Sequence, residues 1–290
     1  MEINFCGIKS ISLKKAKFLI IPIPYESTSS FKSGTKFAPF WIISVSEQLE
    51  LFDEELGREI YKAGIKTLPQ ISPDCKGPSK MVSKIKRYVE RYIKRDKIIV
   101  CIGGEHTITV GIVDAFVERY PSLKVLHLDA HADLRNKYQG TQFSHACIVR
   151  RILDKGCSVY SIGVRSLSRE EWEFLESTKN IKVYFANSMV NNWEEEIPNQ
   201  FPSGNYYITI DADFFDPSLF SEVSVPEPGG FGWFQSLKFL KNFILRKDIN
   251  VVGFDFVELA PSTSISNCCY FASKLIYKII GYIAVKHGEI

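Results

Sequence analysis

The stretch Leu123-Lys-Val-Leu-His-Leu-Asp-Ala-His-Ala-Asp133 joins a short apolar run to three closely spaced polar side chains. The run over 123–128 has the length and composition of a buried β-strand. Asp129, His131 and Asp133 follow this strand at alternating positions. In open α/β sheets, ligand sites gather outside the carboxyl ends of the strands. The stretch therefore predicts both a parallel strand and a site at its end.

Similar apolar runs recur along the chain, and segments with helical periodicity lie between them. Strands are predicted over 17–23, 97–102, 157–162, 181–185, 206–210 and 249–254, and helices over 78–95, 108–120, 144–154, 169–176, 233–245 and 268–285. Strand and helix in alternation indicate a parallel sheet covered on both faces. We found no internal repeat and no long linker in the sequence. We therefore expect one domain over residues 1–290, a three-layer α/β/α fold with a mainly parallel central sheet.

The composition excludes some classes of function. The chain has 36 basic and 33 acidic residues, a net charge of +3, and no arginine-rich block with interleaved aromatic residues. Nucleic-acid binding is therefore not expected. The lysines between Lys84 and Lys97 are better interpreted as the solvated face of a helix.

Cysteine usage and hydropathy predict a cytoplasmic protein. The seven cysteines form neither CxxC pairs nor the regular spacing of a disulfide framework. The N-terminal residues lack a basic region followed by an apolar stretch, and no uninterrupted apolar segment reaches the roughly 18 residues of a membrane span. We therefore expect a soluble chain in a reducing compartment, without a membrane partner.

Other predicted strands are also followed by potential metal ligands. An isolated Asp-x-Asp is common in acidic turns, but several such segments should meet at one sheet edge, and four of the five histidines lie between His106 and His145. Six oxygen and imidazole ligands exceed the set that one structural zinc needs, and they suit two divalent ions sharing bridging carboxylates. The sequence thus predicts a two-metal hydrolase with these candidate ligands: His106, Asp129, His131, Asp133, Asp211 and Asp213.

The same segments resemble the ureohydrolases, the family of arginase, agmatinase and their relatives. The matching motifs span nearly the whole chain in the order of that family: Pro22–Ser27, Gly34–Pro39, Gly103–His106, Asp129–Asp133, Ser144–Cys147, Ile162–Ser166, Asp211–Pro217, Pro226–Gly230 and Asp255–Pro261. The resemblance implies an arginase/deacetylase-like fold, two Mn²⁺ per chain and hydrolysis of a guanidino group to urea and an amine. It also implies a homo-oligomer, either a trimer or a hexamer.

The resemblance also assigns roles to individual residues. One ion would be held by His106 and Asp133, the other by His131 and Asp213, with Asp129 and Asp211 bridging the two. Water between two cations loses its proton near neutral pH and becomes a nucleophile. Glu258 would pair with the substrate guanidinium, and His145 would pass a proton to the leaving amine. A strand-end acid and a core or helix-capping histidine are the alternative interpretations of these last two residues.

Neighbouring residues are given lesser roles. The family match assigns no metal to His127, so a core histidine is expected there. Glu105 is expected only to orient its surroundings, Asp216 to belong to a turn, and Glu227 to a structural loop. Cys147 follows the candidate proton donor closely enough to suggest a Cys-His dyad, but a two-metal nucleophile makes a thiol redundant.

The loop over 133–147 narrows the choice of substrate. This loop looks like those of agmatinases and lacks the Asn- and Ser-rich clamp of arginases, which predicts agmatine as substrate and putrescine as product. The segment 220–225 departs from the Gly-Thr-rich turn of the family and leaves N1-aminopropylagmatine open. Arginine, a guanidino acid or formiminoglutamate are further alternatives, with Arg135 or Lys137 as the carboxylate anchor. A non-catalytic metal-binding homologue is disfavoured because both Glu258 and a proton-donor histidine are present.

Overall fold

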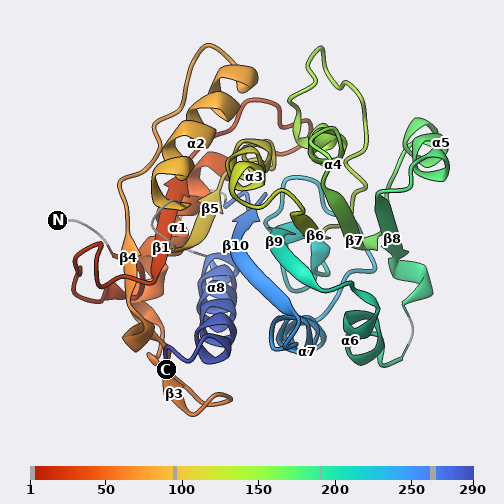
Figure 1. The fold of residues 1–290 in the computed structure, drawn as a ribbon. Coiled ribbons are helices and arrows are strands. Elements are labelled where there is room, and N and C mark those ends of the chain that lie inside the picture. The colour runs from red at the N-terminus through yellow and green to blue at the C-terminus, as the bar shows by residue number, and fades with distance from the viewer. Residues whose placement is uncertain (1–3, 94–96, 190, 262–265) are drawn as a thin grey trace.

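An eight-stranded parallel sheet forms the centre of the computed structural model, which describes residues 4–93, 97–189, 191–261 and 266–290. The strand order is β4-β1-β5-β10-β9-β6-β7-β8, and every neighbouring pair is parallel (Figure 1). The strands are β1 Phe18–Ile23, β4 Ile65–Thr67, β5 Ile98–Gly103, β6 Lys124–Leu128, β7 Ser158–Val164, β8 Ile181–Phe185, β9 Gly204–Asp211 and β10 Ile249–Val257. The predicted fold class and all seven predicted strands are confirmed.

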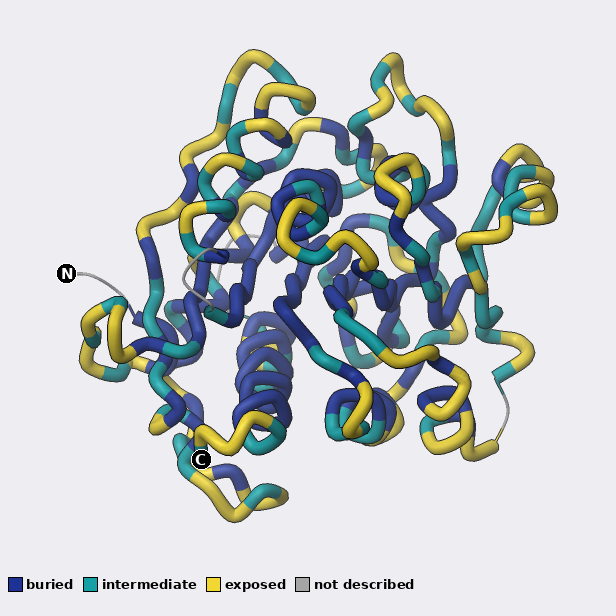
Figure 2. Tube along the Cα trace, viewed as in Figure 1, coloured by how far each residue is buried: buried dark blue, intermediate teal, exposed yellow. Residues whose placement is uncertain are grey.

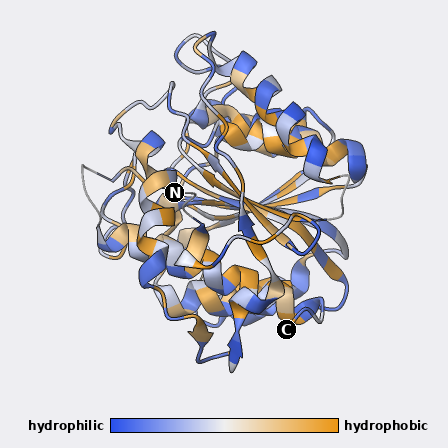
Figure 3. Ribbon diagram, turned by 90° about the vertical axis from the view of Figure 1, so that its left-hand side faces the viewer, coloured by the Kyte–Doolittle hydropathy of each residue, from blue (hydrophilic) through white to orange (hydrophobic). Residues whose placement is uncertain are grey.

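Helices cover both faces of this sheet. One face packs against α2, α3 and α4, and the other against α1, α7 and α8, so the fold has three layers (Figures 1 and 3). The helices are α1 Ala38–Val45, α2 Pro78–Ile93, α3 Ile108–Arg119, α4 Ile148–Leu153, α5 Arg169–Ser177, α6 Trp193–Glu196, α7 Trp233–Ile244 and α8 Asn267–Lys286.

Each central strand contributes to two hydrophobic cores. In β5, Val100 and Ile102 face the core with α1 and α8, whereas Ile99 and Cys101 face the core with α2 and α3. Side chains of a strand point alternately to opposite faces, so a strand covered on both sides must be apolar throughout. Figure 2 shows these strands as a buried centre with the exposed positions outside. This explains why the strands appear as continuous apolar runs in the sequence.

Several short elements were not predicted. Helix α1 has proline in its first turn, where the missing backbone N–H costs no helical hydrogen bond. Strand β4 and the small antiparallel pair of β2 (Phe52–Asp53) and β3 (Arg58–Glu59) have three residues or fewer, too short for a periodicity signal. The helix predicted from Ser144 begins instead with a 3-10 turn over His145–Cys147, before α4. The predicted helix end at Arg95 lies outside the described residues.

Helix α8 has the length and hydropathy of a membrane span, but it is a core helix. In its most apolar 18-residue window, 78% of the residues are buried inside the protein. The buried Lys278 of this helix pairs with the carboxylate of Asp53 at 2.9 Å. Packing against the sheet therefore accounts for the apolar sequence of α8.

Candidate metal centre

The predicted metal ligands and Glu258 follow strands at the centre of the sheet. His106 lies beyond β5, Asp129 directly follows β6, Asp211 ends β9, and Glu258 directly follows β10. These four strands are neighbours in the order β5-β10-β9-β6. Because all are parallel, their carboxyl ends lie at one edge, where segments distant in sequence meet.

The first cluster surrounds the imidazole of His106. Its Nδ1 lies 3.2 Å from Asp129 Oδ2, 3.4 Å from Asp133 Oδ2 and 3.2 Å from Asp211 Oδ2. All four residues are buried, yet Nδ1 has no hydrogen-bond partner among the residues that the structure describes. A buried polar atom without a partner is costly. A cation among these oxygens would give Nδ1 a partner, so the residues fit a metal ion.

The second cluster shares Asp129 with the first. The Nδ1 atom of His131 lies 2.9 Å from Asp213 Oδ2 and 3.6 Å from Asp129 Oδ1. Asp129 thus turns one oxygen toward each histidine, as a bridging carboxylate must. Asp211 turns Oδ2 toward the first cluster, while its Oδ1 accepts the backbone N–H of Asp213.

Electrostatics also favour cations at this position. Burial and the neighbouring Asp213 and Asp129 raise the pKa of Asp211 well above its usual range. Burial opposes a charge on His106, but the carboxylates around it raise its pKa well above the ordinary value. Closely packed carboxylates repel one another in a medium of low dielectric constant. Divalent ions would remove that repulsion.

His127 is close enough to the first cluster to count as a potential ligand, but both of its ring nitrogens are already engaged. Its Nε2 lies 2.9 Å from Asp129 Oδ2, and its Nδ1 lies 3.0 Å from Ser161 Oγ. These two contacts leave neither ring nitrogen of His127 available to a metal ion. His127 is therefore better described as the expected core histidine, which here orients the bridging carboxylate of Asp129.

A second buried network, which was not predicted, holds His106. Its Nε2 lies 2.8 Å from Thr209 Oγ1, and this hydroxyl donates to Asp255 Oδ1 at 2.6 Å. Thr109 and Tyr207 donate to the other oxygen of Asp255, both at 2.9 Å. The single hydroxyl proton of Thr209 goes to Asp255, so the Thr209 oxygen accepts a hydrogen bond from the Nε2–H of His106. The Nδ1 atom of His106 is then left to bind a metal ion.

One sequence signal could have revealed this network. Thr209 lies two residues before Asp211, and His127 two residues before Asp129, so each shares a strand face with a ligand. The register pairs His127 with Ser161 and Thr209, and Thr209 with Asp255. Polar residues in otherwise apolar strands form a buried row across the sheet beneath the ligands.

Glu258 lies beside the first cluster. Its oxygens accept the backbone N–H of His106 and the hydroxyl of Ser224, each at 2.5 Å. Burial raises the pKa of Glu258 to about 8. Glu258 has φ of +61° and Asp133 has φ of +52°, left-handed conformations that are strained for residues other than glycine and that cluster at functional sites. Ser224 belongs to the unusual 220–225 segment and was missed by the sequence prediction.

A small cavity of about 160 Å³ joins the ligands to the two other predicted residues. His145 and Glu258 both line it, together with His106, His131 and Asp211. The pKa of His145 is lowered, mainly by burial. The structure therefore brings all eight predicted site residues together.

Residues in and around this cavity bear on several roles that the sequence left open. Arg135 lines the cavity with its guanidinium 5.0 Å from the ring centre of Tyr138. Lys137 is exposed and is not part of the lining, so the geometry favours Arg135 over Lys137 as a carboxylate anchor. Burial raises the pKa of Cys147 to about 11, which agrees with a thiol that is not a nucleophile. Glu227 lies closer to the site than expected, with Oε1 3.8 Å from His131 Nε2.

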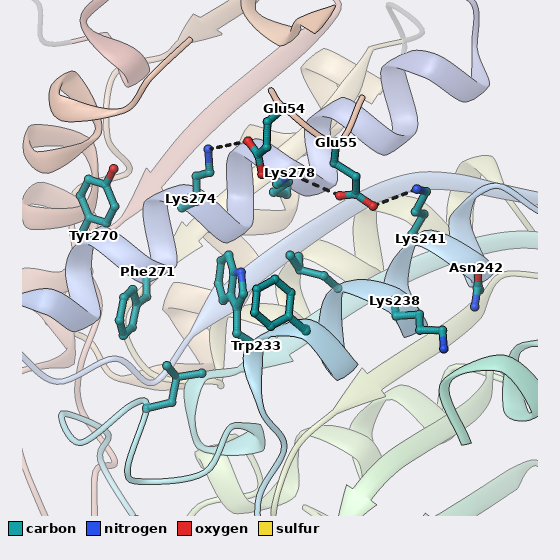
Figure 4. A pocket seen from close by; sticks show the side chains of 13 residues that line it. Glu54, Glu55, Trp233, Lys238, Lys241, Asn242, Tyr270, Phe271, Lys274 and Lys278 are labelled. Atoms are coloured by element: carbon teal, nitrogen blue, oxygen red, sulfur yellow. Dashed lines mark hydrogen bonds and ion pairs between the residues drawn. The ribbon is translucent and has the colours of Figure 1, made fainter. Parts of the chain in front are cut away.

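A larger cavity of about 900 Å³ lies elsewhere, between α7 and α8 (Figure 4). It is lined by aromatic residues such as Trp233 and Phe271, and by lysines. Lys241 and Lys278 pair with Glu55 at its rim. The carboxylates of this larger cavity pair with lysines, and the residues that line it include no histidine. The smaller cavity is therefore the better candidate for metal chemistry.

Comparison with known proteins agrees with this geometry. Residues 16–281 match the arginase family. An N1-aminopropylagmatine ureohydrolase of Synechocystis is 36% identical over 93% of this chain and 90% of its own length. An agmatinase of Pyrococcus horikoshii is 32% identical over 96% and 95%. The crystal structure of agmatine ureohydrolase of Thermoplasma volcanium superposes with a TM-score of 0.90 at 27% identity, over 100% of this chain and 97% of that one. The chain therefore belongs to the arginase family and is a ureohydrolase.

Proposed function

We propose that the chain is a binuclear manganese ureohydrolase that converts agmatine to urea and putrescine. One observation carries the two-metal part of the proposal. The two oxygens of Asp129 face two different histidines, each of which is accompanied by a further carboxylate. A single ion would leave one of these clusters unused.

The donor atoms favour manganese. All six proposed ligands offer oxygen or imidazole nitrogen, without a thiolate, and such donors suit Mn²⁺ better than soft metals. His106 and Asp133 would hold one ion, His131 and Asp213 the other, and Asp129 and Asp211 would bridge. When bound, two divalent cations lower the pKa of water and supply a nucleophile near neutral pH.

The protein's own residues would bind the substrate and move a proton. Glu258 offers a carboxylate beside the clusters, and a planar guanidinium can donate two parallel hydrogen bonds to such a group. A bound cation favours the ionised form of a carboxylate, which counteracts the effect of burial on Glu258. His145 lines the same cavity and would give a proton to the leaving amine.

The choice of agmatine rests on the loop over 133–147, which lacks the amino-acid clamp of arginases. Relatives named agmatinase and N1-aminopropylagmatine ureohydrolase cover nearly the whole chain. N1-aminopropylagmatine is the second candidate, favoured by the 36% identity to the Synechocystis relative. Arg135 is the remaining candidate anchor for a carboxylate-bearing substrate. We further propose a cytoplasmic homo-oligomer, either a trimer or a hexamer, which light scattering after gel filtration would test.

Urea release from a panel of guanidino compounds tests the proposal. The manganese-loaded enzyme should use agmatine with kcat/KM at least ~100-fold above that for arginine, because the arginine carboxylate and ammonium would remain unpaired at a cost of ~3 kcal/mol. N1-aminopropylagmatine and a guanidino acid complete the urea panel, and formiminoglutamate, whose formimino group cannot yield urea, is followed by the release of formamide. Equal or faster turnover of arginine, or of a carboxylate-bearing compound alone, would overturn the substrate assignment.

Arg135→Ala provides a matched variant for this panel. If the substrate has a cationic tail, removal of a cation from the cavity wall should leave or raise kcat/KM for agmatine. If the substrate bears a carboxylate, the same variant should lower kcat/KM strongly. Absence of both urea and formamide release from the whole panel, with two metal ions bound, would favour the non-catalytic alternative.

A further inference from the structure

The loop that follows β1 is held over the cavity by Glu105. This side chain is fully buried, and its Oε2 accepts the backbone N–H groups of Ser27 and Thr28, both at 2.6 Å. Its Oε1 accepts the hydroxyl of Thr28 at 3.1 Å. Three hydrogen bonds to one buried carboxylate fix both the loop and the direction of the Thr28 hydroxyl.

The fixed hydroxyl lies against His145. Thr28 Oγ1 is 3.1 Å from the backbone nitrogen of His145, which donates to it, and 3.2 Å from the ring Nδ1. A hydroxyl has one proton and two lone pairs. The proton is used on Glu105, so Thr28 can only accept from His145. The two lone pairs match the backbone N–H and an N–H at Nδ1.

The other ring nitrogen faces the substrate cavity. His145 Nε2 lies 3.3 Å from Ser30 Oγ, and both residues line that cavity. A neutral imidazole carries one proton, so an N–H at Nδ1 leaves Nε2 as the acceptor. The nitrogen that exchanges protons is thus the one beside the substrate.

We propose that Thr28, oriented by Glu105, is a positioning residue that fixes His145 in its Nδ1–H form and presents Nε2 to the leaving amine. This inference rests on the proposed hydrolysis of a guanidino group. Hydrolysis joins the oxygen of water to the guanidino carbon, and as the C–N bond breaks its electron pair stays on the leaving nitrogen. This nitrogen takes the proton from Nε2 of the imidazolium, which His145 forms by taking up a proton from solvent beforehand. The product is an amine, and His145 is left neutral with its proton on Nδ1.

The kinetic test uses two substitutions of Thr28 in two backgrounds. Thr28→Val keeps the shape but removes the hydroxyl, and should lower kcat at least ~10-fold while KM and the manganese content stay unchanged. Thr28→Ser should restore kcat to within ~3-fold of the original enzyme. In a His145→Ala background, Thr28→Val should change kcat less than ~2-fold, because its effect passes through the imidazole.

A neighbouring serine serves as the control. The Ser29 hydroxyl is buried and, within the described part of the chain, has no hydrogen-bond partner, so Ser29→Ala should leave kcat unchanged. Equal losses from Thr28→Val in both backgrounds, failure of serine to restore activity, or loss of manganese would each overturn the proposal.

A spectroscopic measurement separates this inference from the proposed function. In protein loaded with diamagnetic Cd²⁺ and labelled with ¹⁵N-histidine, neutral His145 should show a protonated Nδ1 and a bare Nε2. Thr28→Val should mix the two tautomers, and His145→Ala assigns the signal. The opposite tautomer in the original protein would overturn the inference. The expected tautomer without any urea release would instead refute the proposed function alone.

Discussion

Substitution of Thr209 by valine should weaken metal binding although Thr209 is not a metal ligand. The hydroxyl lies between His106 Nε2, at 2.8 Å, and Asp255 Oδ1, at 2.6 Å. With Thr209 present, a proton on Nε2 has a good acceptor and Nδ1 is free. With valine, the acceptor is lost, and His106 gains by keeping a proton on Nδ1 beside the carboxylates. That form competes directly with a cation.

The magnitude follows from the contacts that are lost. Leaving a buried donor without a partner costs ~1–3 kcal/mol, and loss of an interaction that orients a ligand reduces metal affinity ~10–100-fold. We expect about 2 kcal/mol for Thr209→Val, which is roughly a 30-fold increase in the Kd for Mn²⁺. Isothermal titration calorimetry of the metal-free protein measures this Kd, and Thr209→Ser should restore it.

Thr109→Val is the matched control. Thr109 is also buried and donates to Asp255, at 2.9 Å, but to the oxygen that Thr209 does not use. Both valine variants should lose free energy of unfolding, because each removes one donor from the same carboxylate, and Thr209→Val should lose more because it also removes the acceptor of the His106 Nε2–H. Only Thr209→Val should raise the Kd. Unchanged affinity in Thr209→Val, or an equal loss in Thr109→Val, would refute the reasoning.

Four further outcomes are expected. Asp129→Asn should bind fewer than two equivalents of manganese by elemental analysis and lose activity, because the bridging carboxylate faces both clusters; two retained equivalents would contradict the bridge. Glu258→Gln should keep both metals but lower kcat/KM for every guanidino substrate, and a substrate-selective loss would speak against a contact with the guanidinium. Cys147→Ser should keep most activity, since burial raises the pKa of this thiol to about 11; an inactive variant with two metals would favour thiol catalysis. Burial lowers the pKa of His106 and His131, but the nearby carboxylates outweigh it and raise both pKa values well above the ordinary one. Cations must therefore displace protons at pH 7, so calorimetry in buffers of different ionisation enthalpy should show proton release and an affinity that rises with pH.

The clustering of the proposed ligands was predictable because their segments follow apolar runs that mark buried strands. The strand before Asp129 has the apolar residues Val125, Leu126 and Leu128 among its five positions, so the sequence reveals both its burial and its end. Parallel strands then bring such ends to one edge. Polar residues in the strands, such as Thr209, stand out in the sequence, but their partners do not: Thr209 and Asp255 are 46 residues apart, and Thr28 and His145 are 117 apart. Strand order and loop path create those contacts, and no local periodicity encodes either.

Reaction type and substrate choice depend on different parts of the molecule. The metal ligands and Glu258 follow central strands whose positions are set by two hydrophobic cores. The rest of the cavity is lined by Arg135 and Tyr138 from one loop and by Val225 from another. Relatives with different named substrates match this chain at 36% and 32% identity, so overall identity does not decide between the two substrates. We expect the guanidino group to bind at the strand ends and the tail to contact the loops, so changes in these loops should alter the preferred tail while the metal centre and the cleaved bond stay the same.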